Sequence, residues 1–131
     1  MIIDSELELS VSQAIAATAD STNVLDLGAA GDAGKELYML LVVETASDSA
    51  DDGESVTAKL MTASESDFSD AVALIPAVSL AQVAAGVKVI EQRLPVGVKR
   101  YNKLVYTVGG TALTVDPIVS AMLVNATQTN V

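Results

Sequence analysis

The residues that could do chemistry in this 131-residue chain are carboxylates, hydroxyls and a few amines, because it contains no Cys and no His. Thiol catalysis, disulfides, zinc ligation by Cys or His and imidazole acid–base steps are therefore excluded. A serine–histidine–aspartate triad is excluded for the same reason. No motif pairs one of the many Ser and Thr hydroxyls with an activating amine. We therefore predict a protein that is not an enzyme.

One glycine-rich segment, from Gly28 to Lys35, superficially resembles a phosphate-binding loop. Such a loop needs a glycine, four further residues and then Gly-Lys followed by Ser or Thr. Here Ala29 stands at the position of the first glycine, and Glu36 stands where a hydroxyl would bind magnesium. We therefore expect a plain loop, with no nucleotide or other cofactor.

Carboxylates gather in the acidic turn between Asp48 and Glu54. Calcium takes several oxygen ligands, usually from closely spaced carboxylates around a tight glycine turn. The spacing here does not match an EF-hand loop, so a solvated hairpin tip is the first interpretation and a weak cation site the second. A glycosidase pair of carboxylates is disfavoured, because aromatic residues, which stack on sugars, make up only 3% of the chain. We predict no resident metal.

The strongest candidate for a docking surface is a set of four basic residues, Arg93, Lys99, Arg100 and Lys103. Residues 1–75 hold 15 acidic and two basic side chains, whereas residues 76–131 hold two acidic and five basic ones. Strand alternation would place Lys99 and Lys103 on one face and Arg100 on the other. The four residues either protect an ordinary edge strand by their charge or dock an acidic protein surface, which the arginine fork suits well.

Short apolar or alternating runs, separated by Gly-, Asp- or Pro-rich turns, predict about eight β-strands in this chain. They lie near residues 7–11, 23–27, 37–43, 56–61, 72–75, 87–90, 101–108 and 118–124. The continuously apolar run 37–43 is expected to be a central strand covered on both faces. With few aromatics the core must be aliphatic, which favours packed sheets. We expect one all-β domain over residues 1–131, an antiparallel sandwich or barrel.

The two ends of the chain differ in character. Residues 1–10 alternate and carry the apolar side chains Ile2, Ile3, Leu7 and Leu9, so they are a candidate N-terminal arm or edge strand that adds to a sheet on a neighbour. Residues 125–131 are a polar tail.

Charge and hydropathy exclude two classes of partner. The net charge of −10 argues against nucleic acid, because phosphate binding needs a Lys/Arg surface. The longest uncharged run, Ala71 to Val87, is broken by Pro76 and is short for a membrane span. No secretory signal is visible, so we expect synthesis in the cytoplasm.

Four segments in order carry a family resemblance: Met1-Ile-Ile-Asp-Ser-Glu-Leu-Glu-Leu-Ser10, Ser21-Thr-Asn-Val-Leu-Asp-Leu-Gly28, Leu94-Pro-Val-Gly-Val-Lys-Arg-Tyr101 and Tyr106-Thr-Val-Gly-Gly-Thr111. The chain resembles the small jelly-roll capsid cement (decoration) proteins of tailed bacteriophages along nearly its whole length. The resemblance implies a two-sheet jelly roll without catalysis. It also implies a place on the outer surface of the virion and contact with the major capsid protein.

The resemblance further implies symmetric self-association, for which we expect a homodimer ahead of a homotrimer. In this interpretation the chain binds the assembled shell and stabilises it by bridging capsid subunits. The alternative is a free-standing β-sandwich binding module that recognises carbohydrate or a host surface.

Overall fold

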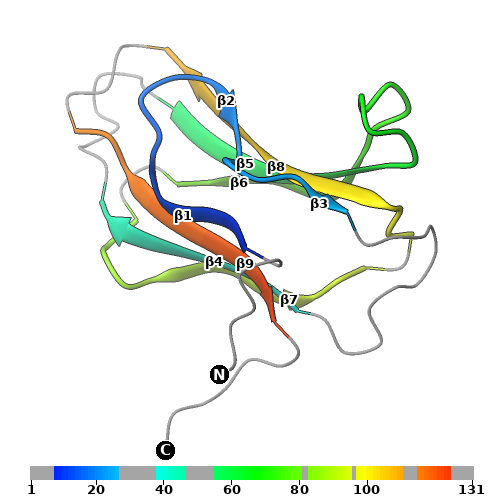
Figure 1. The fold of residues 1–131 in the computed structure, drawn as a ribbon. Coiled ribbons are helices and arrows are strands. Elements are labelled where there is room, and N and C mark those ends of the chain that lie inside the picture. The colour runs from blue at the N-terminus through cyan, green and yellow to red at the C-terminus, as the bar shows by residue number, and fades with distance from the viewer. Residues whose placement is uncertain are drawn as a thin grey trace, which may run out of the picture.

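The computed structural model describes residues 8–26, 38–46, 55–80, 83–95, 97–110 and 115–124, which form nine β-strands in two facing sheets (Figure 1). Sheet A contains, in spatial order, β1 (Glu8–Ala14), β9 (Ile118–Val124), β4 (Tyr38–Thr45) and β7 (Lys88–Arg93). Sheet B contains β2 (Ala19–Asp20), β8 (Tyr101–Gly109), β5 (Ser55–Ala63) and β6 (Val72–Ser79), with β3 (Leu25–Asp26) also paired to β8. Among the described residues there is no helix that could cross a membrane.

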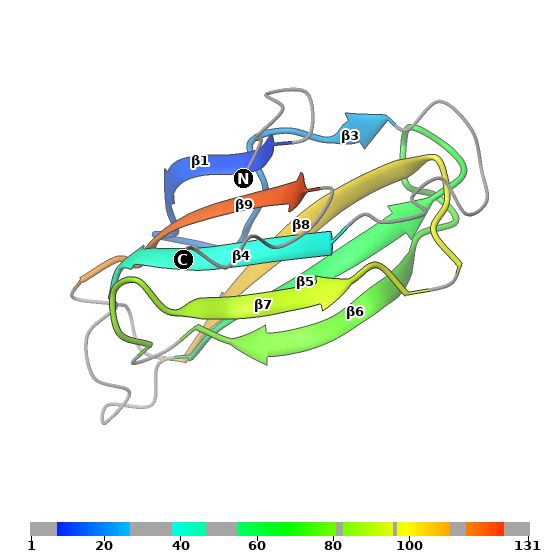
Figure 2. The ribbon, with the colours of Figure 1, turned by 90° about the horizontal axis from the view of Figure 1, so that it is seen from below.

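The strand order is that of a jelly roll. Every pair of neighbouring strands is antiparallel, and the chain repeatedly crosses from one sheet to the other (Figure 2). Strands β2 and β3 are two short pieces beside β8, so the nine strands correspond to the two four-stranded sheets of a jelly roll. The predicted fold class, an antiparallel two-sheet β-sandwich of jelly-roll type, is confirmed.

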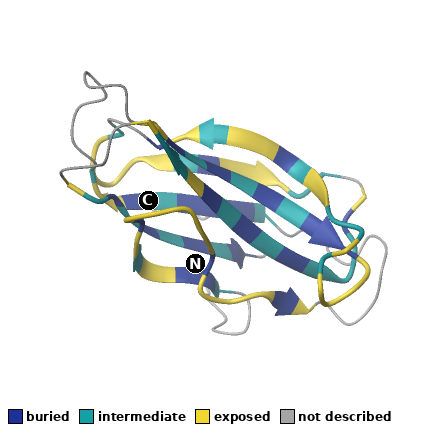
Figure 3. Cartoon of the chain, turned by 90° about the horizontal axis from the view of Figure 1, so that it is seen from above, coloured by how far each residue is buried: buried dark blue, intermediate teal, exposed yellow. Residues whose placement is uncertain are grey.

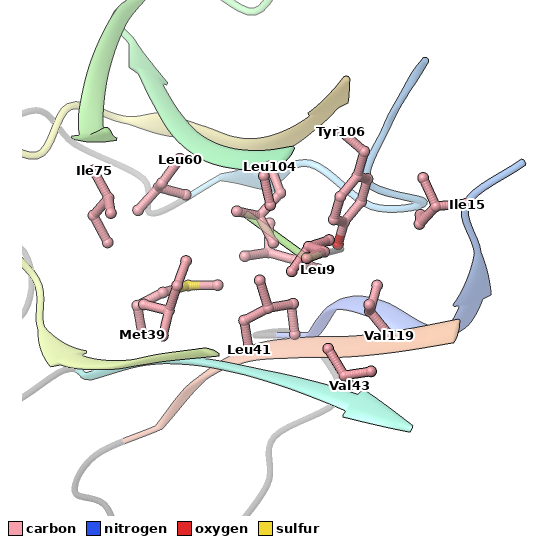
Figure 4. Close-up of a cluster of buried hydrophobic side chains, with 14 of the residues drawn as sticks. Leu9, Ile15, Met39, Leu41, Val43, Leu60, Ile75, Leu104, Tyr106 and Val119 are labelled. Carbon is pink, nitrogen blue, oxygen red and sulfur yellow. The ribbon is translucent and has the colours of Figure 1, made fainter. Parts of the chain in front are cut away.

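The core lies between the sheets and is almost entirely aliphatic. Strand β5 shows the alternation clearly, because Val56, Ala58 and Leu60 are buried while the residues between them reach the outer surface. Figure 3 shows buried and half-buried residues alternating along the long strands. Figure 4 shows side chains of the two sheets meeting, with Met39, Leu41, Val43 and Val119 from sheet A facing Leu60, Ile75, Leu104 and Tyr106 from sheet B. Burial of these side chains supplies the main driving force for folding.

Strand β1 departs from alternation at a bulge. Its register with β9 shifts on both sides of Ser10, and Ser12 has a φ of 46°. As a result Leu9 and Ser10 are both buried while Val11 is 59% exposed. The expected alternation, with Leu9 and Val11 on one face, is wrong here because the extra residue of a bulge reverses the side on which later residues point.

The bulge turns a hydroxyl inward, where it joins the two sheets. Ser10 Oγ lies 2.7 Å from Tyr106 Oη and donates to Gln13 Oε1 at 2.6 Å. The Thr22 amide donates to the same oxygen at 3.0 Å, and Gln13 Nε2 donates to the Asp20 carbonyl at 3.0 Å. This polar seam therefore links β1 of sheet A to β2 and β8 of sheet B.

Strand β6 forms one edge of sheet B. It contains no charged side chain, and Val72 is 50% exposed. Its register with β5 shifts twice, and Pro76 lies in its middle without an amide hydrogen. Bulges and proline prevent a further strand from pairing with an edge, so β6 is protected by its backbone and not by charge.

Candidate docking surfaces

Among the predicted docking residues, Lys99, Arg100 and Lys103 each form an ion pair within the chain. Lys99 Nζ lies 3.3 Å from Asp70 Oδ2, and Lys103 Nζ lies 2.9 Å from Asp20 Oδ2. Arg100 forms a bidentate pair in which Nε and Nη2 donate to the two oxygens of Asp26, at 2.7 and 3.0 Å. Each cation comes from the basic half of the sequence and each carboxylate from the acidic half. Folding therefore cancels, at this surface, the charge asymmetry that is visible along the chain.

Two of the ion-paired cations also lie over aromatic rings. The Lys103 ammonium lies 4.4 Å from the centroid of the Phe68 ring, and the Arg100 guanidinium lies 5.0 Å from that of Tyr101. Hydrogen bonding to Asp26 raises the pKa of Arg100. All three pairs are partly exposed, so each contributes little stability on its own. Because they are satisfied internally, this geometry favours a structural role over docking of an acidic partner.

Asp70 organises the loop between β5 and β6. Its carboxylate accepts hydrogen bonds from the amides of Ser64 and Glu65 and from Lys99 Nζ. Partial desolvation alone would raise the pKa of Asp70, but these hydrogen bonds hold it at about 2. Phe68, in the same loop, adopts a left-handed φ of 58° and lies under Lys103.

Arg93 is separated from the other three basic residues, because it ends β7 in sheet A, where it is paired in register with Tyr38. The four residues are therefore not one strip. The placement of Arg100 on the opposite face from Lys99 and Lys103 is also wrong. Strand β8 begins only at Tyr101, so alternation does not govern Arg100, and its guanidinium reaches Asp26 on the outer side of sheet B.

The outer face of sheet A carries apolar side chains on its two central strands. Met39, Leu41 and Val43 belong to the inter-sheet core, so the residues between them face outward. This apolar face consists of Tyr38, Leu40 and Val42 from β4 and Ile118, Met122 and Val124 from β9, with Ser120 among them. On the same side of the sheet, Arg93 and Glu91 of β7 lie opposite Tyr38 and Leu40.

The apolar face is shielded from water at its centre. Leu40 and Val124 are only 3% and 1% exposed, and the other apolar residues of the face are half-buried. The prediction that the run 37–43 is a central strand covered on both faces is therefore confirmed at its centre, because Met39 and Leu41, which face sheet B, and Leu40, which faces away from it, are all buried.

A single carboxylate is held in place at one end of the apolar face. Glu44, at the end of β4, accepts hydrogen bonds from Ser120 Oγ at 2.5 Å and from Ser12 Oγ at 2.7 Å. These bonds lower its pKa. The Ser12 amide in turn donates to Ser120 Oγ at 2.9 Å. The bulge in β1 is thus what brings Ser12 to Glu44, across three neighbouring strands.

The structure describes only the last part of the candidate N-terminal arm, from Glu8 onward. Leu9 is fully buried in the core, so it belongs to the folded sandwich and not to an arm. The outer edge of β1 at this point is occupied, because Asn23 donates from its backbone amide to the Leu9 carbonyl and from Nδ2 to the Glu8 carbonyl. Ile2, Ile3 and Leu7 lie outside the described residues, as do the acidic turn 48–54 and the tail 125–131, and those expectations stay predictions.

Three described carboxylates, Glu44, Asp67 and Asp70, have a lowered pKa. A general acid working near neutrality needs a raised pKa. No group of acidic residues among those described is arranged to hold a metal ion.

Comparison with known proteins connects the chain to one family. The family model described as Bbp16 matches residues 9–122, which is nearly the whole described sandwich. No curated protein matches the chain.

Proposed function

The chain belongs to the Bbp16 family, and we propose that it is a structural virion protein, a cement protein of a tailed-phage capsid. It binds the outer surface of the assembled icosahedral shell and stabilises the shell by bridging subunits of the major capsid protein. It acts without catalysis and without a cofactor. It is made in the host cytoplasm and associates with itself, most simply as a homodimer.

The observation that carries this proposal is the jelly-roll order of the strands, with β1, β9, β4 and β7 in one sheet and β2, β8, β5 and β6 in the other. Jelly rolls recur in viral capsid proteins and lectins. The resemblance of the sequence to cement proteins points the same way.

The mechanism requires no strong individual contact. A protein that binds the assembled shell better than free subunits stabilises the assembled state by mass action. A molecule that bridges two subunits gains further from effective concentration, because the second contact is intramolecular. The acidic character of the chain, with a net charge of −10, would help to keep decorated particles soluble.

Co-sedimentation of the purified protein with expanded capsids that lack it tests the proposal. We expect saturable binding at a fixed ratio to the capsid subunit, together with a raised melting temperature of the capsid. If the protein neither binds nor shifts the capsid melting temperature, the cement function is wrong. Screening against glycans and host surfaces would then test the binding-module alternative.

A further inference from the structure

The two sides of the sandwich differ in whether the sheets are joined across them. On one side the Asn23 amide donates to the Leu9 carbonyl of β1, and Ser21 exchanges hydrogen bonds with Leu104 of β8. On the opposite side the sheets end in β6 and β7 (Figure 2). Since β2 and β3 are only two residues long, the described edges suited to take a further strand are those of β6 and β7.

Strand β7 is the more regular of these two edges. In β6, Pro76 lacks an amide hydrogen and the register with β5 shifts twice, which prevents a further strand from pairing. In β7 the register with β4 shifts once, between Leu41 and Val42, so residues 90–93 are paired without interruption. Charged side chains are what remains to protect this part of the β7 edge.

The backbone of β7 presents hydrogen-bonding groups to the open side. Val43 of β4 directs both its amide and its carbonyl to the segment that leads into β7. The direction of these groups alternates along a strand, so Met39 also directs its groups toward β7. Met39 is paired with Gln92, whose groups therefore point back to β4. The residues on either side, Glu91 and Arg93, direct their amides and carbonyls to the open edge.

We propose that β7 pairs antiparallel with β7 of a second copy of this chain, across a two-fold axis at Gln92. The backbone of Glu91 in each copy then exchanges hydrogen bonds with Arg93 of the second copy, and the two sheets A form one continuous sheet. The interface is self-complementary, as a two-fold dimer requires. This inference rests on the homodimer of the proposed function and names the surface that forms it.

Charge selects this register over its neighbours. Glu91 and Arg93 lie on the outer face of sheet A, opposite Leu40 and Tyr38. With the axis at Gln92, each Glu91 lies directly opposite Arg93 of the second copy, which is favourable. An axis at residue 91 would oppose two glutamates, and an axis at residue 93 would oppose two arginines. The Gln92 side chains meet at the axis, where each amide can donate and accept.

The surroundings of β7 tolerate the approach of a second copy. The strand carries two basic side chains and one acidic one, so the net charge of −10 is not concentrated at this edge. Glu91 is paired with Lys88 at 3.0 Å, and a carboxylate has acceptor positions for an arginine as well. Strand β6, at the same side, has no charged side chain, so no charge would be desolvated along it.

Exchanging the two charges tests the interface. Glu91→Arg and Arg93→Glu each place like charges opposite one another, whereas the double variant restores opposite charges. Lys59→Glu, in mid-strand of sheet B, is the matched control, because it changes the net charge as Arg93→Glu does. Thermal unfolding establishes that each variant is folded, and sedimentation velocity measures association. We expect the wild type and the control to dimerise, each single reversal to weaken association at least about tenfold, and the double variant to recover to within about threefold of the wild type.

The same preparations are then tested by co-sedimentation with expanded capsids, which separates the interface from the cement function. Single reversals without effect, or a double variant as weak as the single ones, would overturn the interface. A wild-type monomer would also overturn it; if the reversals then weaken only capsid binding, the β7 edge takes a strand of the shell and not a second copy. A dimer with the expected charge dependence that fails to bind capsids would uphold the interface and overturn the cement function.

Discussion

At the scale of single residues, the structure depends on a few polar side chains whose partners lie far away in the sequence. Ser10 and Tyr106 meet 96 positions apart, and Lys99 reaches Asp70 across 29 positions. Local patterns predicted which segments would be strands, because alternation is a property of neighbours. They could not predict the bulge at Ser12, which is stabilised by Ser120 and Glu44 from other strands.

The Ser10–Tyr106 contact should behave as a coupled pair. Burial raises the pKa of Tyr106 to about 12, although the hydrogen bond to Ser10 acts in the opposite direction. Ser10→Ala leaves a buried phenol without its partner and should lower the free energy of unfolding by about 1–3 kcal/mol. Tyr106→Phe should lower it by about 1 kcal/mol. Urea unfolding of both variants and of the double variant measures the coupling, and strictly additive losses would contradict it.

Asp70 makes stability depend on pH in the acid range. Its pKa falls on folding from the ordinary value of 3.8 to about 2, so its stabilising contribution is complete above pH 3.8 and is lost as the pH falls through about 2. Asp70→Asn should therefore melt at a lower temperature than the wild type at pH 7. Melting followed by circular dichroism from pH 7 to pH 2 should show the difference shrinking at the acid end. A difference that stays constant with pH would contradict the assignment.

At the scale of elements, the edge strands show what single-sequence patterns miss. Pro76 was expected to follow a short strand at 72–75, yet β6 continues through it to Ser79. An edge strand tolerates proline because one side of its backbone has no partner strand. Whether a strand lies at an edge depends on the order of strands in the sheet, which an isolated run of apolar residues does not contain.

Restoring an amide hydrogen at the β6 edge should increase self-association of the protein. Pro76→Thr gives β6 the donor that it lacks and removes one of its protections, so we expect greater self-association on heating or at high concentration. Sedimentation velocity and light scattering measure this. Ala77→Thr, at the adjacent exposed position, is the matched control, since it adds the same side chain without a new amide donor. Equal association of the two variants would show that Pro76 does not protect the edge.

At the scale of the whole molecule, the chain alternates between sheets, so neither sheet can be built from one continuous segment. The long-range ion pairs, the polar seam and the core all join distant parts of the sequence. The all-β class could be predicted from strand runs and turns, and the jelly roll from resemblance. The pairing of the acidic half with the basic half could not, because it requires knowledge of which strands are neighbours.

This interleaving predicts a single cooperative transition and slow folding. Non-local strand pairing delays folding, typically to milliseconds or seconds. Urea unfolding followed by far-ultraviolet circular dichroism and by tyrosine fluorescence should give coincident curves, because both sheets share one core. Separate transitions for the two signals would mean that one sheet survives without the other.

Strand order also bears on the timing of synthesis. Strand β9 lies between β1 and β4 in sheet A. Among the strands that the structure describes, β1 therefore pairs only with β9, which is translated last. Until β9 emerges, β1 and β4 are unpaired along the edges that will adjoin it. Sheet A can therefore be completed only after β9 has been translated, and until then its apolar strands are prone to aggregate.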